Sequence, residues 1–367
     1  MEILKVHESH KQMNRVLRYC VLAMLAIPAV PDWAGAQVYP ERVVRHEGAR
    51  VIAAAYQRGR RDDNNREEQV ERTTKAFKLG ASGVLALGNI AGDIAVTRGG
   101  GSDTTVEIVK TARGRDVNDA REMLQLVQVE ATERGGRADV RTHYPRGDEG
   151  NRNNRRNVNV SVAYNVTAPA GTRISIESIS GNVKIVDIKG DVSANSISGD
   201  VRISGAGRIN AAKTISGVVE ITDAEIDGAL ESSSVSGDVL LRRVTARRID
   251  ASSVSGNVRL DDVQCDRVSV NSTSGSVAFS GPLARNGRYE LNSFSGEVRL
   301  ALSGNTGFEI DANSFSGNVQ SDLQITSRGS AQGSRNGRRR VLNGTYGDGS
   351  AVLDLTTFSG SIVITKR

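Results

Sequence analysis

The sequence has few of the residues on which disulfide scaffolds, metal sites and large aromatic cores depend. It contains two cysteines, four histidines and one tryptophan in 367 residues, and aromatic residues make up only 4%. Cys20 lies near the N-terminus, so Cys265 is alone in the rest of the chain and an intrachain disulfide there is excluded. Only His46 and His143 lie beyond the first 36 residues. We therefore expect no metal or other cofactor, and a narrow core filled by Val, Ile and Ala.

Residues 1–36 have the organisation of a secretory signal peptide. Four basic residues precede an apolar stretch over residues 19–30, and Ala34-Gly35-Ala36 is a small-residue cleavage site. The apolar stretch is too short to span a membrane, and no later one reaches that length. Met1 and Met13 both remain possible starts. The sequence thus predicts a secreted protein, periplasmic or at the cell surface, with no transmembrane segment after cleavage.

One short phrase recurs through residues 178–360. A hydroxyl residue, an apolar residue, Ser and Gly follow one another, as in 178–181, and the next glycines come after 18, 18, 20, 19, 19, 21, 21 and 43 residues. A fixed period of this length is the signature of a solenoid, in which each repeat buries its apolar face only against its neighbours. The sequence therefore predicts an all-β fold, a parallel β-solenoid of about ten coils of 18–21 residues.

Period-two alternation on both sides of the glycine predicts two short strands in each coil. Apolar residues stand seven and five positions before the glycine in most repeats, as in Ile174 and Ile176. The Ser-Gly-Asn or Ser-Gly-Asp turn between the strands suits residues that tolerate positive φ. Three phenylalanines occupy the apolar slot of the phrase in the last repeats (Phe294, Phe315, Phe358), from which we expect the core to widen toward the C-terminus. The positions two and four after the glycine form two further columns: Val183, Val201, Val219, Val239, Val258, Val277, Val298, Val319 and Ile362, then Ile185, Ile203, Ile221, Leu241, Leu260, Phe279, Leu300, Ser321 and Ile364.

The remaining segments flank this repeat. Residues 37–72 are polar and are expected to be flexible. Residues 73–157 hold degenerate coils and an N-terminal cap, with a helix near 116–126 and a hairpin around Gly135-Gly136. The regular solenoid is expected to span 158–367, and the excursion 328–349 is expected to cap its C-terminal end, because exposed sheet edges need covering.

These residues resemble a known bacterial family. The serial Ser-Gly-Asn/Asp-Val coils, the approach Tyr164-Asn165-Val166-Thr167-Ala168-Pro169 and the closing run from Gly347 to Ile362 are similar to the DUF4097 family, described as candidate adhesins with β-strand repeats. The resemblance spans about residues 73–367. It implies a β-solenoid at the bacterial cell envelope and supplies no catalytic residues.

Two sets of side chains could indicate catalysis. The serines before each glycine, Ser180 through Ser359, lack a nearby histidine, so we interpret them as a stacked hydrogen-bonding ladder rather than as nucleophiles. Asp238, Asp261 and Asp262 form the best acidic cluster for a carbohydrate-active β-helix enzyme, either a lyase or a hydrolase. Because Asp238 shares its slot with Asn in other repeats, a turn role is the preferred interpretation and no catalytic residue is predicted.

The arginines suggest a binding surface. The chain has a formal charge of +6, and six arginines fall in successive coils, so we expect several to project from one side as a polyanion-binding stripe. The leading hypothesis is a non-enzymatic scaffold or adhesin that binds a glycan, another anionic polymer or an envelope protein. The scarcity of aromatics disfavours nucleic acid. A carbohydrate-active enzyme and an envelope-stress sensor domain remain the alternatives. The six residues are Arg242, Arg243, Arg247, Arg248, Arg259 and Arg267.

Overall fold

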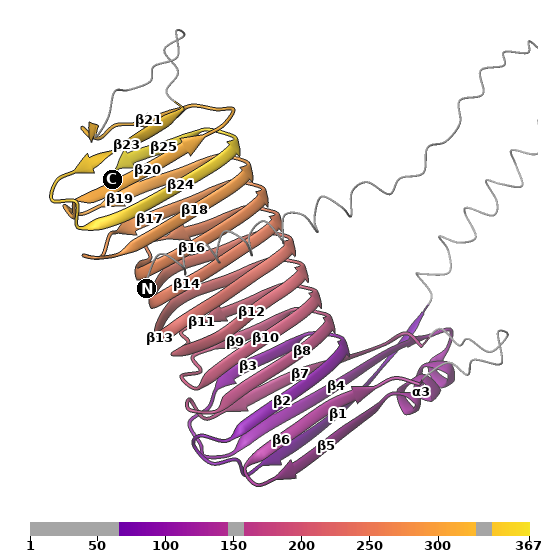
Figure 1. Ribbon diagram of the computed structural model, residues 1–367. Helices are drawn as coiled ribbons and strands as arrows, with labels where there is room; N and C mark the ends of the chain where they lie inside the picture. The colour runs from indigo at the N-terminus through magenta and orange to yellow at the C-terminus, as the bar shows by residue number, and fades with distance from the viewer. Residues whose placement is uncertain (1–65, 146–157, 328–339) are drawn as a thin grey trace, which may run out of the picture. The chain divides into compact units, whose positions relative to one another are not determined.

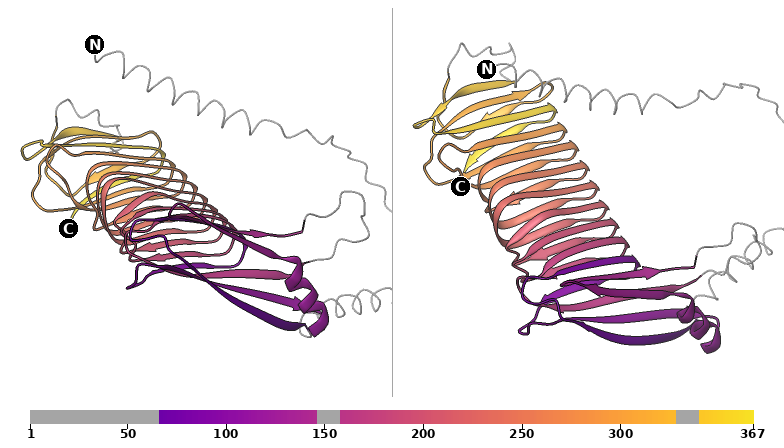
Figure 2. Two further views of the ribbon diagram at one scale, coloured as in Figure 1. Left: turned by 90° about the horizontal axis from the view of Figure 1, so that it is seen from below. Right: turned by 60° about the horizontal axis from the view of Figure 1, so that its bottom comes forward.

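The computed structural model describes residues 66–145, 158–327 and 340–367. All the described residues belong to one compact unit, Arg61–Arg367. The predicted signal peptide and most of the predicted flexible segment lie outside the described residues. This unit is a stack of β-coils, and Figures 1 and 2 show the coils lying one above another.

The coils pair in register through two long parallel ladders. The first contains β8 (Arg173–Ser180), β10 (Asp191–Ser198), β12 (Arg208–Ser216), β13 (Val219–Ser236), β14 (Val239–Ser255), β16 (Gln264–Ser274), β18 (Arg288–Ser295), β24 (Ala351–Ser359) and β20 (Phe308–Ser314). The second contains β9 (Val183–Val186), β11 (Val201–Ser204), the first parts of β13 and β14, β15 (Val258–Asp261), β17 (Val277–Pro282), β19 (Val298–Ser303), β25 (Ile362–Lys366) and β21 (Val319–Ser321). The fold is therefore all-β and solenoid-like, as the repeat predicts.

The predicted core columns are buried. Every residue two positions after the glycine is at most 5% exposed, and those four after it are buried except Ser321, which is partly exposed. The upstream positions, such as Ile174 and Ile176, are equally covered. Successive coils thus stack Val on Val and Ile on Leu, so each coil completes the apolar core of its neighbours.

Coils in the middle of the stack have more than the two strands that alternation predicts. β13 and β14 continue past the second ladder into a further parallel segment, where Ala224 pairs with Val244. The chain turns this corner at a residue with positive φ, which is 57° at Asp187, 54° at Asp223 and 53° at Asp262. Aspartate tolerates this conformation better than most side chains. These carboxylates therefore stand where the backbone requires a turn.

The repeated glycine is required mainly by close backbone approach. A Cβ at Gly256 would lie 2.1 Å from the carbonyl oxygen of Gly237 in the preceding coil. The same distance is found between Gly199 and Gly181, where φ is also positive at 142°. No other residue fits where two turns touch this closely.

The predicted serine ladder is wrong in its position. The serine directly before each glycine is exposed, whereas the hydroxyl residue two places earlier is buried. Ser253 Oγ donates to the Gly237 carbonyl at 2.9 Å, and Ser272 Oγ to the Gly256 carbonyl at 3.1 Å. This geometry follows from alternation, because the earlier hydroxyl faces inward and the later serine begins the turn.

The Asn/Asp slot after the glycine forms a ladder of its own, which confirms a turn role. Asp238 Oδ1 accepts from the backbone N–H of Asn257 at 2.7 Å, and Asn257 Oδ1 accepts from that of Ser276 at 3.0 Å. Each side chain therefore satisfies the turn of the next coil.

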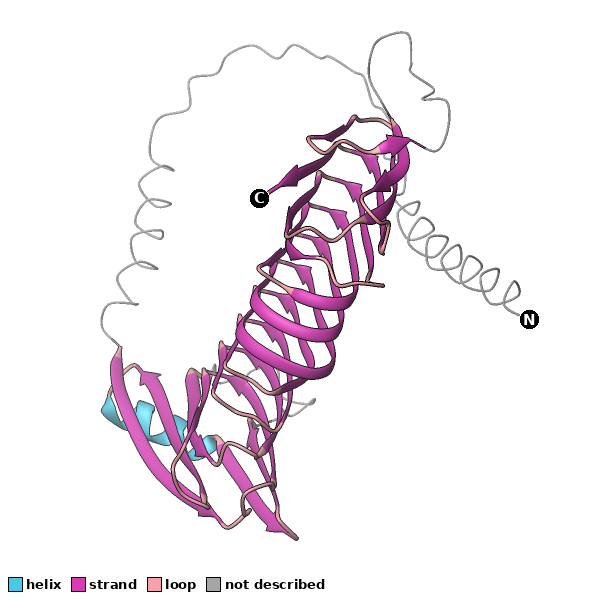
Figure 3. Cartoon of the chain, turned by 90° about the vertical axis from the view of Figure 1, so that its left-hand side faces the viewer, coloured by secondary structure: helices cyan, strands magenta, loops and turns pink. Residues whose placement is uncertain are grey.

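The N-terminal region combines an early coil with an antiparallel cap. β2 (Val84–Ala91) and β3 (Ile94–Arg98) pair in parallel with β8 and β9, so this stretch is the degenerate coil that the sequence predicts. The predicted hairpin is β5 (Gln128–Arg134) and β6 (Arg137–His143), and β6 also pairs with β2. The predicted helix is α3 (Val117–Leu126), capped by Asp116, and is the helix drawn in cyan in Figure 3.

Two predicted boundaries in this region are wrong. β1 (Glu67–Phe77) pairs antiparallel with β4 (Thr104–Gly114), so order begins before residue 73. The sequence of β1 lacks hydrophobic alternation because the strand is held by charged cross-strand pairs. In one of them Arg113 Nε lies 2.9 Å from Glu68 Oε2. β7 (Val160–Ala168) pairs antiparallel with β4 and parallel with β3, so it belongs to the cap and the regular coils begin with β8.

The C-terminal end is interleaved. β24 pairs with β18 on one side and β20 on the other, and β25 lies between β19 and β21. The final strands therefore do not close the stack, as their place in the sequence suggests, but insert inside it. The predicted capping excursion contributes β23 (Val341–Tyr346), which covers β20 in antiparallel fashion and pairs with β22 (Thr326–Ser327).

The apolar residue of each phrase lies outside the core, contrary to the predicted widening. The side chains stand on the outer surface of the first ladder, where Phe294 is 52% and Phe315 66% exposed. The phenylalanine rings stack on one another, with centroid distances of 4.9 Å from Phe294 to Phe358 and 4.7 Å from Phe358 to Phe315. We call this row the outer apolar column: Ile90, Ile179, Ile197, Ile215, Val235, Val254, Thr273, Phe294, Phe358 and Phe315, in spatial order.

Candidate functional site

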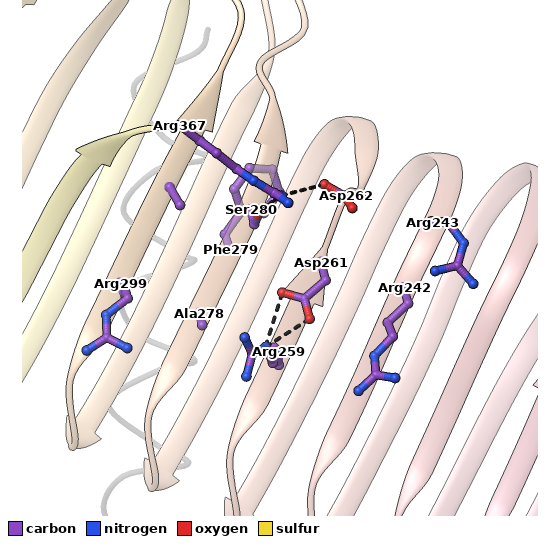
Figure 4. A pocket seen from close by; sticks show the side chains of 11 residues that line it. Arg242, Arg243, Arg259, Asp261, Asp262, Ala278, Phe279, Ser280, Arg299 and Arg367 are labelled. Atoms are coloured by element: carbon purple, nitrogen blue, oxygen red, sulfur yellow. Dashed lines mark hydrogen bonds and ion pairs between the residues drawn. The ribbon is translucent and has the colours of Figure 1, made fainter.

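An open pocket of about 400 Å³ lies on the outer surface of the second ladder. Its walls come from β14, β15, β17 and β19, together with the C-terminal residue Arg367 (Figure 4). The lining residues are Arg242, Arg243, Arg259, Asp261, Asp262, Ala278, Phe279, Ser280, Arg299, Ala301 and Arg367.

The pocket exists because small residues interrupt a row of long ones. Ala278 lies directly between Arg259 and Arg299 in the parallel register. Since adjacent strands are about 4.8 Å apart, the two arginine Cα atoms are separated by roughly 10 Å with only a methyl group between them. Ser280 and Ala301 extend this floor along the strands. The result is a small-residue floor with a guanidinium group at each side.

Positive charge predominates in the lining. Five arginines and two aspartates give a formal sum of +3. Arg259 Nε donates to both carboxylate oxygens of Asp261, at 3.1 and 2.9 Å, and Arg367 donates to Asp262 at 2.7 Å and to Ser280 Oγ at 2.9 Å. Asp261 and Asp262 thus hold arginines in place around the pocket.

The other arginines of the pocket have partners outside it. Arg299 pairs with Glu297 at 2.7 Å, whereas Arg242 is only in long-range contact with Glu220, at 3.9 Å. The hydrogen bonds between Arg243 and Asp223 raise the pKa of the guanidinium and lower that of the carboxyl. Arg242 is therefore the most weakly paired cation of the lining.

The six predicted arginines do not form one stripe. Arg242, Arg243 and Arg259 line the pocket, but Arg248 and Arg267 lie opposite each other on the first ladder. Arg247 is paired with Asp227. The predicted stripe is wrong for Arg247, Arg248 and Arg267, because the chain turns at Arg243, where φ is 50°, and residues a few positions apart then face different sides of the coil.

Sequence reasoning missed two arginines of the pocket. Arg299 occupies the same outward slot as Arg259 two coils earlier, so extending the repeat alignment could have found it. Arg367 reaches the pocket only because β25 inserts beside β19. The linear sequence carries no signal for that contact.

The predicted acidic cluster does not converge on a reacting group. Asp238 belongs to the turn ladder and is not part of the pocket lining, while Asp261 and Asp262 are ion-paired. His143 lies near Glu130 in the hairpin, at 3.4 Å, and His46 is outside the described residues. Within the described ranges, no cluster of three or more His, Cys, Asp or Glu side chains is arranged to hold a metal ion. Among the same residues no helix has the length and apolarity needed to cross a bilayer.

Comparisons with known proteins complete this description. No curated protein matches the chain. Among solved structures, a candidate cell adhesion protein from Clostridium sporogenes ATCC 15579 is 11% identical, with 82% of this chain and 100% of that chain covered and a TM-score of 0.23. A candidate adhesin from Bacteroides fragilis NCTC 9343 is 14% identical, covering 81% and 97%, with a TM-score of 0.34. Another from Parabacteroides merdae ATCC 43184 is 10% identical, covering 81% and 96%, with a TM-score of 0.33.

The family comparison concerns the middle of the solenoid. Residues 209–286, which run from β12 to the turn before β18 and include most of the pocket, match the family described as Toastrack DUF4097. The resemblance that the repeated turn phrase indicates is thereby confirmed over residues 209–286, a part of the range 73–367 over which it is expected.

Proposed function

We propose that this protein is a secreted, non-enzymatic scaffold of the adhesin type, a rod of about ten coils that holds an anionic polymer at the cell envelope through the arginine-lined pocket. The observation that carries the proposal is the pairing of Arg259 and Arg299 across the floor at Ala278. Planar guanidinium groups bind carboxylate and sulfate or phosphate oxygens in bidentate fashion, and the open floor leaves room for a sugar ring between them.

The geometry favours binding over catalysis. A glycoside hydrolase needs two carboxyl groups facing one bond, one of them free to act as an acid. Here both pocket carboxylates accept hydrogen bonds from arginines. The two carboxylates hold the guanidinium groups of Arg259 and Arg367 in place. This arrangement supports binding of an acidic polymer rather than its cleavage.

An acidic polysaccharide suits the pocket better than nucleic acid. Single-stranded nucleic acids bind to exposed aromatic rings on which their bases stack. The aromatic side chain of the lining, Phe279, is 1% exposed and belongs to the core. Sugars that carry a carboxylate or sulfate group can instead be bound by the arginine side chains, with the sugar ring lying over the small residues of the floor.

The test is binding of polygalacturonate and of a sulfated dextran to the purified protein, measured by calorimetry at several salt concentrations. We expect binding that weakens as salt rises, and a loss of about tenfold or more in R259A/R299A. The matched control is R248A/R267A, which removes the same charge from the first ladder and should leave affinity nearly unchanged.

Two further measurements distinguish binding in the pocket from binding by net charge, and binding from cleavage of the polymer. A278F keeps every charge but fills the floor, so it should weaken binding as R259A/R299A does. Chromatography of the polymers after incubation should show no shortened products. Equal losses of affinity in R259A/R299A and R248A/R267A would show that binding depends on net charge alone. Shortened polymers would show that the protein is a carbohydrate-active enzyme.

A further inference from the structure

The outer apolar column is an exposed hydrophobic surface on a different side of the coil from the pocket. Its residues project from the first ladder, whereas the pocket lies on the second. Ile197 is 48%, Val235 47% and Val254 51% exposed. An exposed row of this kind, in which Thr273 is the one hydroxyl side chain, is uncommon on a monomer and marks an interaction site.

The residues beside the column are largely uncharged. In the strands from β13 to β20, the next outward position holds only Ser, Asn or Thr, and the charged residues begin one position further away, as at Glu231 and Asp250. The cores of protein interfaces are depleted of charge in this way, and their rims are polar. The neutral positions are Ser233, Ser252, Asn271, Asn292, Thr356 and Asn313.

The aromatic end of the column is suited to aliphatic partners. The rings of Phe294, Phe358 and Phe315 stack nearly parallel, with interplanar angles of 1° and 7°. Stacking covers most ring faces and leaves ring edges outward. A sugar would need an exposed face, so this surface is matched to aliphatic side chains rather than to a glycan.

The column is large enough for a stable dimer. Its members occupy adjacent strands from β2 to β20, which at about 4.8 Å per strand gives a length of roughly 45 Å. With its neutral neighbours and the turn serines it is roughly 17 Å wide, since alternate residues of a strand are about 7 Å apart. The product is on the order of 800 Å² per partner, which is the size of a standard interface.

We propose that two copies of this chain associate face to face through the outer apolar column, with their long axes antiparallel. A second copy has the same strand spacing, so every rung of one column meets a rung of the other over the full length. A two-fold axis along the strand direction, between β13 and β14, generates this arrangement.

The sizes of the side chains favour the antiparallel orientation. The axis places Val235 of one protomer against Val254 of the other, at the centre. Toward the ends, Ile197 meets Phe294 and Ile179 meets Phe358. Large residues at one end thus face medium ones from the other end, so neither end of the interface collects all the large side chains. A parallel dimer would stack all the phenylalanines against each other and separate the isoleucines.

The charges at the rim are compatible with this pairing. The same axis brings Arg288 opposite Asp191 of the other protomer, because both occupy the eighth position before their glycine. Glu231 comes opposite Asp250, but Asp250 is already bonded to Arg248 at 2.8 and 3.0 Å. Asp191 already pairs with Arg208 of its own chain at 3.7 Å, and the axis also brings Arg208 opposite Arg267, so the rim charges do not decide the pairing.

The first experiment is sedimentation velocity of the purified protein from 1 to 100 µM. We expect a concentration-dependent species with the mass of two chains. V235K/V254K, which places lysines at the centre of both columns, should raise the dissociation constant at least 100-fold. The matched control is V70K/L126K, since Val70 and Leu126 are 48% and 36% exposed in the N-terminal cap, away from the column. A monomer throughout, or equal losses in both variants, would overturn the proposal.

Cross-linking tests the orientation. In a C20S background, a mixture of I197C and F294C proteins should form a disulfide-linked dimer under mild oxidation, while each protein alone should not. Cys265 is only 5% exposed and does not compete. Cross-linking of F294C with itself would contradict the antiparallel arrangement.

Discussion

Two serines in the same slot of the repeat should respond oppositely to the same substitution. Ser196 and Ser272 are each 6% exposed and both occupy the inward hydroxyl position. Ser272 Oγ donates to the Gly256 carbonyl at 3.1 Å, whereas Ser196 Oγ is buried with no hydrogen-bond partner among the described residues. The pair therefore isolates the contribution of one hydrogen bond at constant burial and constant chemistry.

The magnitudes follow from the two environments. S272A removes a hydrogen bond and leaves the partly buried Gly256 carbonyl without that donor, which we expect to lower the free energy of unfolding by about 1–3 kcal/mol. S196A removes a hydroxyl that was buried without compensation, so its effect should lie between zero and about 1 kcal/mol of stabilisation. The difference between the variants should be about 2 kcal/mol. Effects on the unfolded chain cancel because the substitution is identical.

Urea denaturation followed by far-ultraviolet circular dichroism measures this difference through the midpoint at constant slope. In a thermal scan the midpoints should differ by about 4 °C, since 1 kcal/mol corresponds to about 2–4 °C in domains of 150–250 residues and this chain is longer. Equal losses of stability in S196A and S272A would refute the reasoning, because they would show that the slot needs a hydroxyl whether or not it is bonded.

Three other predictions concern the repeated glycine, the partly buried Asp354 and the buried Cys265. G256A should destabilise the protein by about 3 kcal/mol or more, because its Cβ would lie 2.1 Å from the Gly237 carbonyl, whereas G100A, with no atom within 4 Å of its Cβ, should unfold at the wild-type urea concentration. Burial and the neighbouring Glu290 and Asp311 raise the pKa of Asp354, so its ionisation costs stability as pH rises from about 3.8 upward. D354N should therefore raise the thermal midpoint at pH 7 but not at pH 3, and an equal shift at both pH values would contradict this. Burial raises the pKa of Cys265 to about 11, so its thiol should react with a disulfide reagent at pH 8 only after denaturant is added, and rapid labelling of the native protein would show that the thiol is accessible.

The periodic part of the fold could be predicted because its physics is local. Alternation around Val183 and Ile185 gives strand direction and burial within one coil, and the repeat gives the stacking. The sequence predicts the three phenylalanines in the core, but they are exposed, because the inward position of the phrase is taken by the hydroxyl residue that precedes each of them. At Ser293 the inward position is polar and at Phe294 the outward position is apolar, which reverses the usual pattern and conceals the exposed column.

Only three of the five arginines of the pocket could be predicted from the sequence, because the lining comes from different coils and from Arg367. Arg242 and Arg259 stand out as arginines in successive repeats, but their separation from Arg248 depends on the turn at Arg243. The contribution of Arg367 depends on where β25 inserts. Backbone turns and strand exchange are decided by tertiary packing, which one sequence does not display.

The insertion of the last coil has a consequence for how the protein is made. β20 and β21 precede β24 and β25 in the chain, yet they lie further from the N-terminal cap. During synthesis, the strands β18 and β19 are made well before their final neighbours β24 and β25. The stack therefore cannot assemble strictly in chain order, because β20 and β21 gain their inner neighbours only once β24 and β25 have inserted. Because Arg367 also lines the pocket, the pocket is completed only after β25 has inserted beside β19.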